Sequence, residues 1–164
     1  MTTLRYVYVF ALVVWLGGMV ALGAVVAPTI FQTLQSLSPQ DGRAFAGEAF
    51  KAMLVRFHYV AYACGALLLL SLLGMGLLGP RPKGYAIRAG LVALMLGVAL
   101  YSGLVVLAEI DGIQQEVGTL PSRLPLEDPR RLRFDGLHVL ATRLMQINIV
   151  AALALLWWEA KDYS

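Results

Sequence analysis

The sequence predicts an all-α integral membrane protein, a four-helix bundle with a short interfacial helix before the second span. Its 164 residues are 59% hydrophobic and have a mean hydropathy of +0.73, which exceeds that of ordinary soluble domains. Four apolar runs, at about 5–28, 54–79, 84–108 and 136–159, are each long enough to cross a bilayer as a helix. Because these runs fill most of the chain, we expect one transmembrane domain covering 1–164 and no soluble domain.

The first and third runs carry small residues at helical spacing. Gly17 and Ala21 stand four residues apart in the first run, and Gly90, Ala93 and Gly97 share one face of the third. Small residues let membrane helices approach closely. We therefore expect both faces to pack against neighbouring helices of the bundle.

The connecting segments predict breaks between the spans. Pro28 should end or kink the first helix. Residues 38–53 read as the amphipathic interfacial helix, with Ser38 as its N-cap and Pro39 at its first position. A basic turn follows at 80–84 and a proline-containing loop at 118–132. No convincing internal repeat is visible in the sequence.

Orientation follows from the positive charges beside the spans. Four crossings put both termini and the turn at 80–84 on one side. This side has fewer basic residues than the other, but its connecting loop is very short and has no acidic residue, and short loops dominate topology. We expect both termini in the cytoplasm, with the protein in a bacterial inner membrane.

A polar stripe marks the start of the last run. Asp135, His138, Thr142 and Gln146 recur at steps of three and four, so they share one helix face, and Arg143 lies at its edge. Ionisable and amide side chains are costly in hydrocarbon, so such a stripe by default faces protein, water or a ligand. We expect the other three helices to pack around it.

The chain has two histidines, and each is the second residue of an apolar run. His58 opens the second run and His138 the fourth, and both runs start on the same side of the membrane. The two imidazoles should therefore lie at nearly the same depth. Such a pair suits axial ligation of haem b, or of copper with Met53 or Met145 as a soft ligand. Alternatively, each histidine simply reaches interfacial water.

Residues around the histidines extend the cofactor hypothesis. Tyr62 lies on the His58 face, and three arginines could hold haem propionates: Arg56, Arg133 and Arg143. The predicted cofactor residues are thus His58, His138, Arg56, Arg133, Arg143 and Tyr62, and the predicted metal ligands are His58, His138, Met145 and Met53.

Other functional classes find little support. The sequence has no HExxH motif, phosphate-binding loop or nucleophile elbow, so we expect no catalytic residues and favour a protein that is not an enzyme. Its net charge of +3 lies in loops and helix ends, which argues against nucleic acid. The competing hypothesis is a small transporter or accessory membrane subunit without a cofactor. A transporter would need a water-accessible cavity around Arg143, Gln146 and Asn148. The expected partners are the lipid bilayer and either another membrane protein or a second copy.

Two motifs resemble a known family. Trp15-Leu-Gly-Gly through Pro28-Thr-Ile-Phe31, and Phe134-x-x-Leu137-His138, are similar to the signature stretches of the transmembrane protein 205-like family. The family usually has a serine where this chain has Ala141. It is similar in layout to copper-resistance D-type membrane proteins and to a haem-binding membrane oxidase. The resemblance implies a four-helix bundle and makes haem or copper the expected cofactor, while a eukaryotic member associated with drug export implies transport.

Overall fold

The computed structural model describes residues 2–79, 83–118 and 120–162. The first rod runs continuously through α1, a π-helical segment η1 and α2, and α3 returns beside it. The third rod runs through α4, a π-helical segment η2 and α5. The fourth rod, α6, returns beside it after a short 3-10 turn, η3. The bounds are α1 Thr2–Ala21, η1 Leu22–Val26, α2 Ala27–Leu37, α3 Gly42–Leu78, α4 Tyr85–Tyr101, η2 Ser102–Val106, α5 Leu107–Val117, η3 Pro121–Arg123 and α6 Pro129–Lys161.

Within the described ranges, four helical rods are long and apolar enough to cross a membrane: 2–37, 42–78, 85–117 and 129–161. This confirms the predicted all-α membrane bundle. The rods have 33 to 37 residues, whereas about 20 residues at 1.5 Å each span a hydrocarbon core of about 30 Å. Each rod is therefore longer than one membrane crossing.

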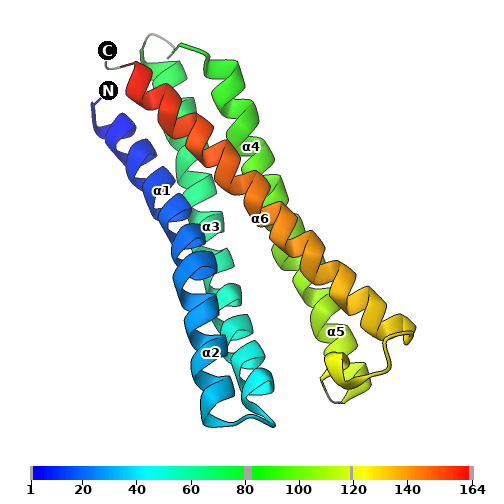
Figure 1. Ribbon diagram of the computed structural model, residues 1–164. Helices are drawn as coiled ribbons and strands as arrows, with labels where there is room; N and C mark the ends of the chain where they lie inside the picture. Colours follow the sequence, from blue (N-terminus) through cyan, green and yellow to red (C-terminus); the bar gives the residue numbers. More distant parts are fainter. Residues whose placement is uncertain (1, 80–82, 119, 163–164) are drawn as a thin grey trace.

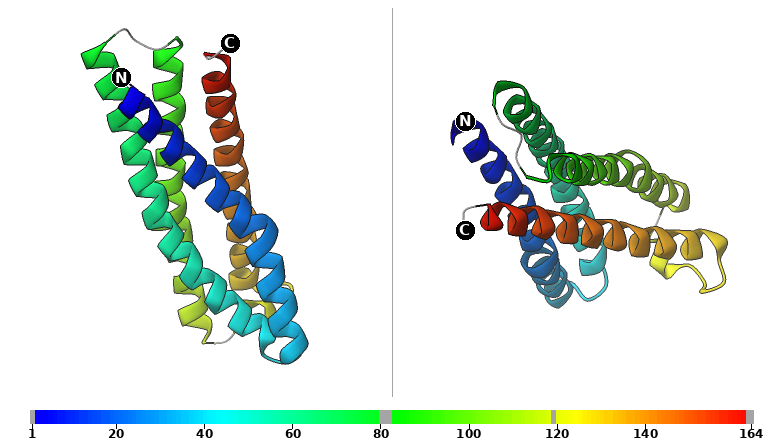
Figure 2. Two further views of the ribbon diagram at one scale, coloured as in Figure 1. Left: turned by 90° about the vertical axis from the view of Figure 1, so that its left-hand side faces the viewer. Right: turned by 90° about the horizontal axis from the view of Figure 1, so that it is seen from above.

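The rods form two hairpins that meet at one end of the molecule. α1 packs against α3 and α6, and α4 packs against the same two helices, so α3 and α6 occupy diagonal corners. Both termini lie at the end where the hairpins meet, and α2–α3 diverges from α5–α6 toward the other end (Figures 1 and 2). Lys51 of α3 and Asp111 of α5 form an ion pair of 2.6 Å that bridges this diverging end.

The two hairpins are structural repeats separated by 80 positions. η1 at 22–26 corresponds to η2 at 102–106, and α2 at 27–37 corresponds to α5 at 107–117. Eight buried positions coincide under the same shift, although others, such as Ala61 and Cys64, have half-buried counterparts. The coinciding positions are Tyr8, Leu12, Trp15 and Met19 with Arg88, Val92, Met95 and Ala99, and Leu68, Ser71, Leu72 and Met75 with Asn148, Ala151, Ala152 and Leu155. This correspondence lies in the structure and is not visible as a repeat in the sequence.

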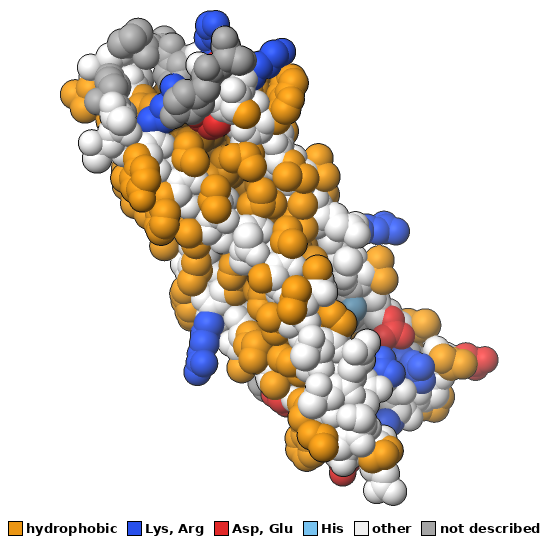
Figure 3. Space-filling view, turned by 60° about the vertical axis from the view of Figure 1, so that its left-hand side comes forward, with side chains coloured by type: hydrophobic (Ala, Val, Ile, Leu, Met, Phe, Trp, Pro, Cys, Tyr) orange, Lys and Arg blue, Asp and Glu red, His pale blue; other side chains and the backbone are white. Residues whose placement is uncertain are grey.

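The predicted small-residue faces do not pack inside the bundle. Gly17, Ala21, Gly90, Ala93 and Gly97 are all exposed, and a Cβ added at any of the three glycines would meet no atom within 4 Å. The close approaches lie elsewhere, since Gly18 faces the Phe57 ring, and a Cβ on buried Gly65 would lie 2.7 Å from Leu96 Cδ1. The spacing of the small residues showed that they share one helix face, but not whether that face points into the bundle or away from it. On the face shown in Figure 3, hydrophobic side chains cover much of the surface between the charged ends.

The segment before the second span is not a separate helix. Ser38 is the C-cap of α2, the N-cap of α3 is Asp41, and α3 continues unbroken from Gly42 to Leu78. No proline falls inside this range, so nothing forces a break. The predicted interfacial helix is therefore the first part of α3, and Ser38 does not cap it.

Two prolines act differently from the prediction. Pro28 does not interrupt the first rod, because it lies at the start of α2 directly after the widened π-helical segment. Pro129 starts α6, with the Asp128 carboxylate accepting a hydrogen bond from the Arg130 N–H. The loop predicted at 118–132 is therefore shorter. Of the turn predicted at 80–84, residues 80–82 lie outside the described residues.

Candidate functional site

His58 lies between the two hairpins. It is half-buried on α3, and its ring centroid lies 6.0 Å from that of Tyr62 one turn later. Both side chains press against Gly103 of η2, where an added Cβ would lie 2.5 Å from His58 Cδ2 and would also clash with the Tyr62 hydroxyl. Glycine at 103 therefore makes room for this imidazole and phenol on the facing helix.

His138 occupies the equivalent position on α6, 80 residues later. It is exposed, and its ring centroid lies 4.4 Å from that of Phe134. The glycine equivalent to Gly103 is Gly23 of η1, which is also exposed and has the Met145 methyl, not His138, beside it. The second site is thus an open version of the first.

The same hydrogen bond orients both imidazoles. His58 Nδ1 lies 2.8 Å from the carbonyl oxygen of Leu54, and His138 Nδ1 lies 3.1 Å from that of Phe134. A carbonyl oxygen only accepts, so each Nδ1 must carry the proton and donate. In the neutral ring Nε2 then keeps its lone pair, and a backbone carbonyl on Nδ1 is the usual support for a histidine that ligates metal through Nε2.

The structure does not bring the two histidines together. His58 faces η2 on the α3–α4 side, whereas His138 is on α6, diagonal to α3. Within the part of the chain that the structure describes, no three His, Cys, Asp or Glu side chains form a group able to hold a metal. Met53 is 40% exposed, and Met145 packs against the core beside Gly23.

The three predicted arginines are also dispersed. Arg56 and Arg143 are exposed, and Arg133 forms an ion pair with Glu109 of α5. Arg133 lines an open depression of about 450 Å³ between α5 and the start of α6, together with Glu109, Gly112, Ile113, Glu116, Pro129 and Arg130. This depression contains neither histidine.

The polar stripe on α6 faces outward. Asp135, His138, Thr142 and Gln146 are all exposed, so the expectation that three helices pack around them was wrong. The residues that α6 buries lie on another face and include Asn148, whose Nδ2 donates to the Met95 carbonyl at 3.2 Å. Arg143 and Gln146 are therefore separated from Asn148, and the three line no common cavity.

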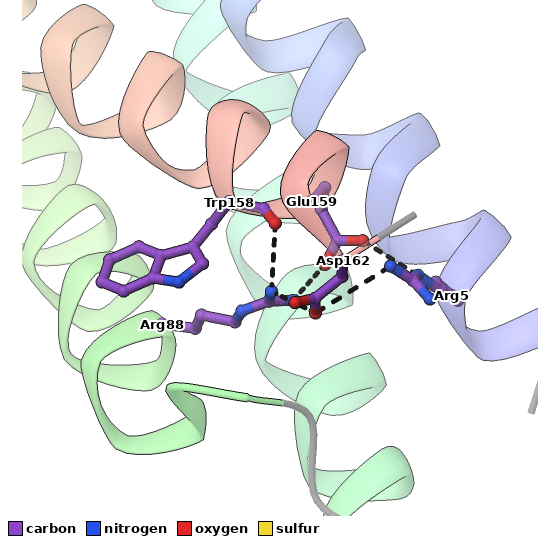
Figure 4. A network of polar contacts seen from close by, with 5 residues as sticks. All are labelled: Arg5, Arg88, Trp158, Glu159 and Asp162. Atoms are coloured by element: carbon purple, nitrogen blue, oxygen red, sulfur yellow. Dashed lines mark hydrogen bonds and ion pairs between the residues drawn. The ribbon is translucent and has the colours of Figure 1, made fainter. Parts of the chain in front are cut away.

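An ion network at the terminal end escaped the sequence analysis. Arg88 of α4 is 1% exposed and pairs with Glu159 of α6, while its second terminal nitrogen lies 2.7 Å from Asp162. Arg5 of α1 reaches the same Glu159 at 2.9 Å (Figure 4). Three helices are thus joined by one buried cluster. An arginine inside an apolar run was the available signal, but it was counted only as a topological charge.

A family model described as a domain of unknown function (DUF4149) matches residues 10–118. The match covers α3 with His58 and both π-helical segments, and it ends before α6, so His138 lies outside it. No curated protein and no solved structure matches the chain.

Proposed function

The chain belongs to the DUF4149 family, and we propose that it is a membrane protein that binds a redox-active cofactor or metal through histidine, haem b first and copper second. One observation carries the proposal. The two histidines occupy the same position in two structural repeats, and in both the Nδ1 proton is held by the carbonyl oxygen four residues earlier.

We assign a separate haem or copper ion to each of the two histidines. Each imidazole offers one Nε2 lone pair, and at His58 the Tyr62 ring and the backbone of Gly103 lie beside the imidazole. One iron held by both rings does not fit the hairpins as they stand, since His58 packs against η2 whereas His138 is exposed on α6. The proposal therefore assigns one imidazole to each site. A bound haem or copper would supply one-electron chemistry.

Absorption spectra and metal analysis of the purified protein test the proposal. We expect uptake of haem or copper on reconstitution, lowered by His58→Ala or His138→Ala and abolished in the double variant. Gln32→Ala, at an exposed position on α2, is the control. A protein that takes up neither group, or a double variant that still does, would overturn the proposal.

Spin state distinguishes the two geometries of ligation. Two imidazoles on one iron give a low-spin haem spectrum, whereas one imidazole per iron leaves a coordination position open and gives a high-spin spectrum. The separate surroundings of the two rings, with His58 against η2 and His138 exposed, predict the high-spin form. The resemblance to the transmembrane protein 205-like family supports haem or copper through layout alone.

A second candidate is an accessory membrane subunit without a cofactor. The observation that favours it is the outward direction of the stripe Asp135, His138, Thr142 and Gln146, since polar side chains at membrane depth need partners. A colourless, metal-free protein that copurifies with another membrane protein would select this function. A transport path has less support, because Arg143 and Gln146 do not share a cavity with Asn148.

For the location, we propose a bacterial inner membrane with both termini in the cytoplasm. The support is the short basic connection near Lys83 on the terminal side. In a variant whose native Cys64 is replaced, Lys83→Cys should react with an impermeant thiol reagent only from the cytoplasmic side, and Ser38→Cys only from the outside. The reverse pattern would invert the topology.

A further inference from the structure

One face of α6 carries a regular seam that no other part of the described chain covers. Its members recur at steps of three and four residues, and all are exposed: Val139, Thr142, Gln146, Val150, Leu153 and Trp157. Val150 and Trp157 keep 66% and 61% of their surface. Steps of three and four are the spacing of a helix–helix seam. Gln146 is the one amide on it.

Gln146 lies within the hydrocarbon region. Trp157, Trp158 and the buried Glu159 cluster mark one membrane boundary. Gln146 precedes Trp158 by 12 residues, which is about 18 Å along a helix, whereas the hydrocarbon core is about 30 Å thick. Its amide makes no hydrogen bond with any described residue. An unpaired amide facing lipid is costly, so its partner must come from outside the chain.

A second copy of this chain supplies that partner. A glutamine amide has both donors and an acceptor, so it complements itself. Two copies cross the membrane in the same direction, and a twofold axis between their α6 helices puts equal residues opposite each other. A single polar residue on such a seam fixes register and parallel pairing. We propose that α6 forms a parallel homodimer with α6 of a second copy, centred on Gln146.

The first hairpin offers the matched control. Ala66 of α3 stands 80 residues before Gln146 and is also exposed, but it carries no amide. The same face of α3 is exposed too, with Tyr59, Leu70, Leu73 and Leu77 at the equivalent positions, so the amide alone distinguishes the second hairpin. The proposal does not depend on cofactor binding.

Cysteine cross-linking in membranes tests the interface. In a Cys64→Ala background, Gln146→Cys and Leu153→Cys should form disulfide-linked dimers under mild oxidation, and Ala66→Cys should not. Failure of both α6 variants to cross-link, or equal cross-linking at Ala66, would overturn the proposal.

Dimerisation measured by energy transfer in detergent tests the role of the amide. Interhelical hydrogen bonds in membranes contribute modest free energies, so Gln146→Leu should weaken the dimer by about 3- to 30-fold. Gln146→Asn should retain most of the affinity, and the melting temperature of the monomer should not fall in either variant. An unchanged dimer in Gln146→Leu, or a monomeric wild-type protein, would overturn the proposal.

Discussion

His58 and His138 stand at equivalent positions of two repeats, yet their surroundings differ. On the α3–α4 side, His58 and Tyr62 press against Gly103 of η2 and close the interface between the hairpins. On the α6–α1 side, His138 and Thr142 are exposed and Gly23 of η1 faces only Met145. The same backbone plan thus gives one closed and one open interface.

The difference resides in a few side chains rather than in the helices. Tyr62 on the closed side is Thr142 on the open side, a smaller side chain whose hydroxyl donates back to the His138 carbonyl at 2.9 Å. At the terminal end, Tyr8 in the first repeat corresponds to Arg88 in the second, and only the arginine has ionic partners. The repeat determines where a position lies, and the residue type determines what it does.

The largest effect should come from the buried ion network, whose central cation, Arg88, stands where the first repeat has Tyr8. Arg88→Met removes the cation shared by Glu159 and Asp162. Breaking a buried pair typically costs 3–5 kcal/mol, and because Arg5 still contacts Glu159, we expect a loss of about 3 kcal/mol in the free energy of unfolding in detergent. Adding Glu159→Gln should restore part of it. An unchanged stability would mean that the network is solvated.

Alanine at the two equivalent glycines should change thermal stability differently at the closed and the open interface. Gly103→Ala forces His58 and Tyr62 away from η2, and overpacking of this kind costs about 1–3 kcal/mol. Gly23→Ala meets only the flexible Met145 methyl, 3.1 Å away, so its melting temperature should be unchanged or higher. Equal effects in thermal unfolding would contradict the difference between the interfaces.

Replacing Tyr8 by phenylalanine should show that the stability of the fold does not require a hydroxyl at this position. Its side chain is fully buried, and its hydroxyl has no hydrogen-bond partner among the described residues. An unpaired buried hydroxyl is destabilising, so Tyr8→Phe should leave the melting temperature unchanged or raise stability by up to about 1 kcal/mol. A clear loss would reveal a partner, such as a buried water.

The N-caps of α6 and α3 should give the smallest difference in melting temperature. The contribution of the α6 cap should depend on pH. The Arg130 side chain, and then its backbone N–H, hold the pKa of Asp128 below its usual range, whereas Asp41 at the start of α3 makes no capping bond. A lowered folded-state pKa adds stability above the ordinary value of about 4, and this is lost as pH falls through the lower folded pKa. Between pH 7 and 3, Asp128→Asn should therefore flatten a small decline in melting temperature.

Apolar length alone was sufficient to predict four membrane helices, because burying an apolar run in lipid requires little else. The repeat was hidden because equivalent positions keep burial but not chemistry, as with Leu68 and Asn148. The direction of the α6 stripe was missed because periodicity groups residues on a face without saying which face meets a neighbour. The pairing of Arg88 with Glu159 joins residues 71 positions apart, and no local pattern connects them.

The positions of the two π-helical segments bear on how the two hairpins could have arisen. A π-helical segment is a one-residue insertion that a helix absorbs by widening a turn, and here it occurs at residues 22–26 and again at 102–106. Pro28 follows only the first, so proline does not explain both. If the hairpins descend from one ancestral hairpin, a single insertion before duplication and fusion accounts for both segments. Two later insertions would have had to fall on the same turn.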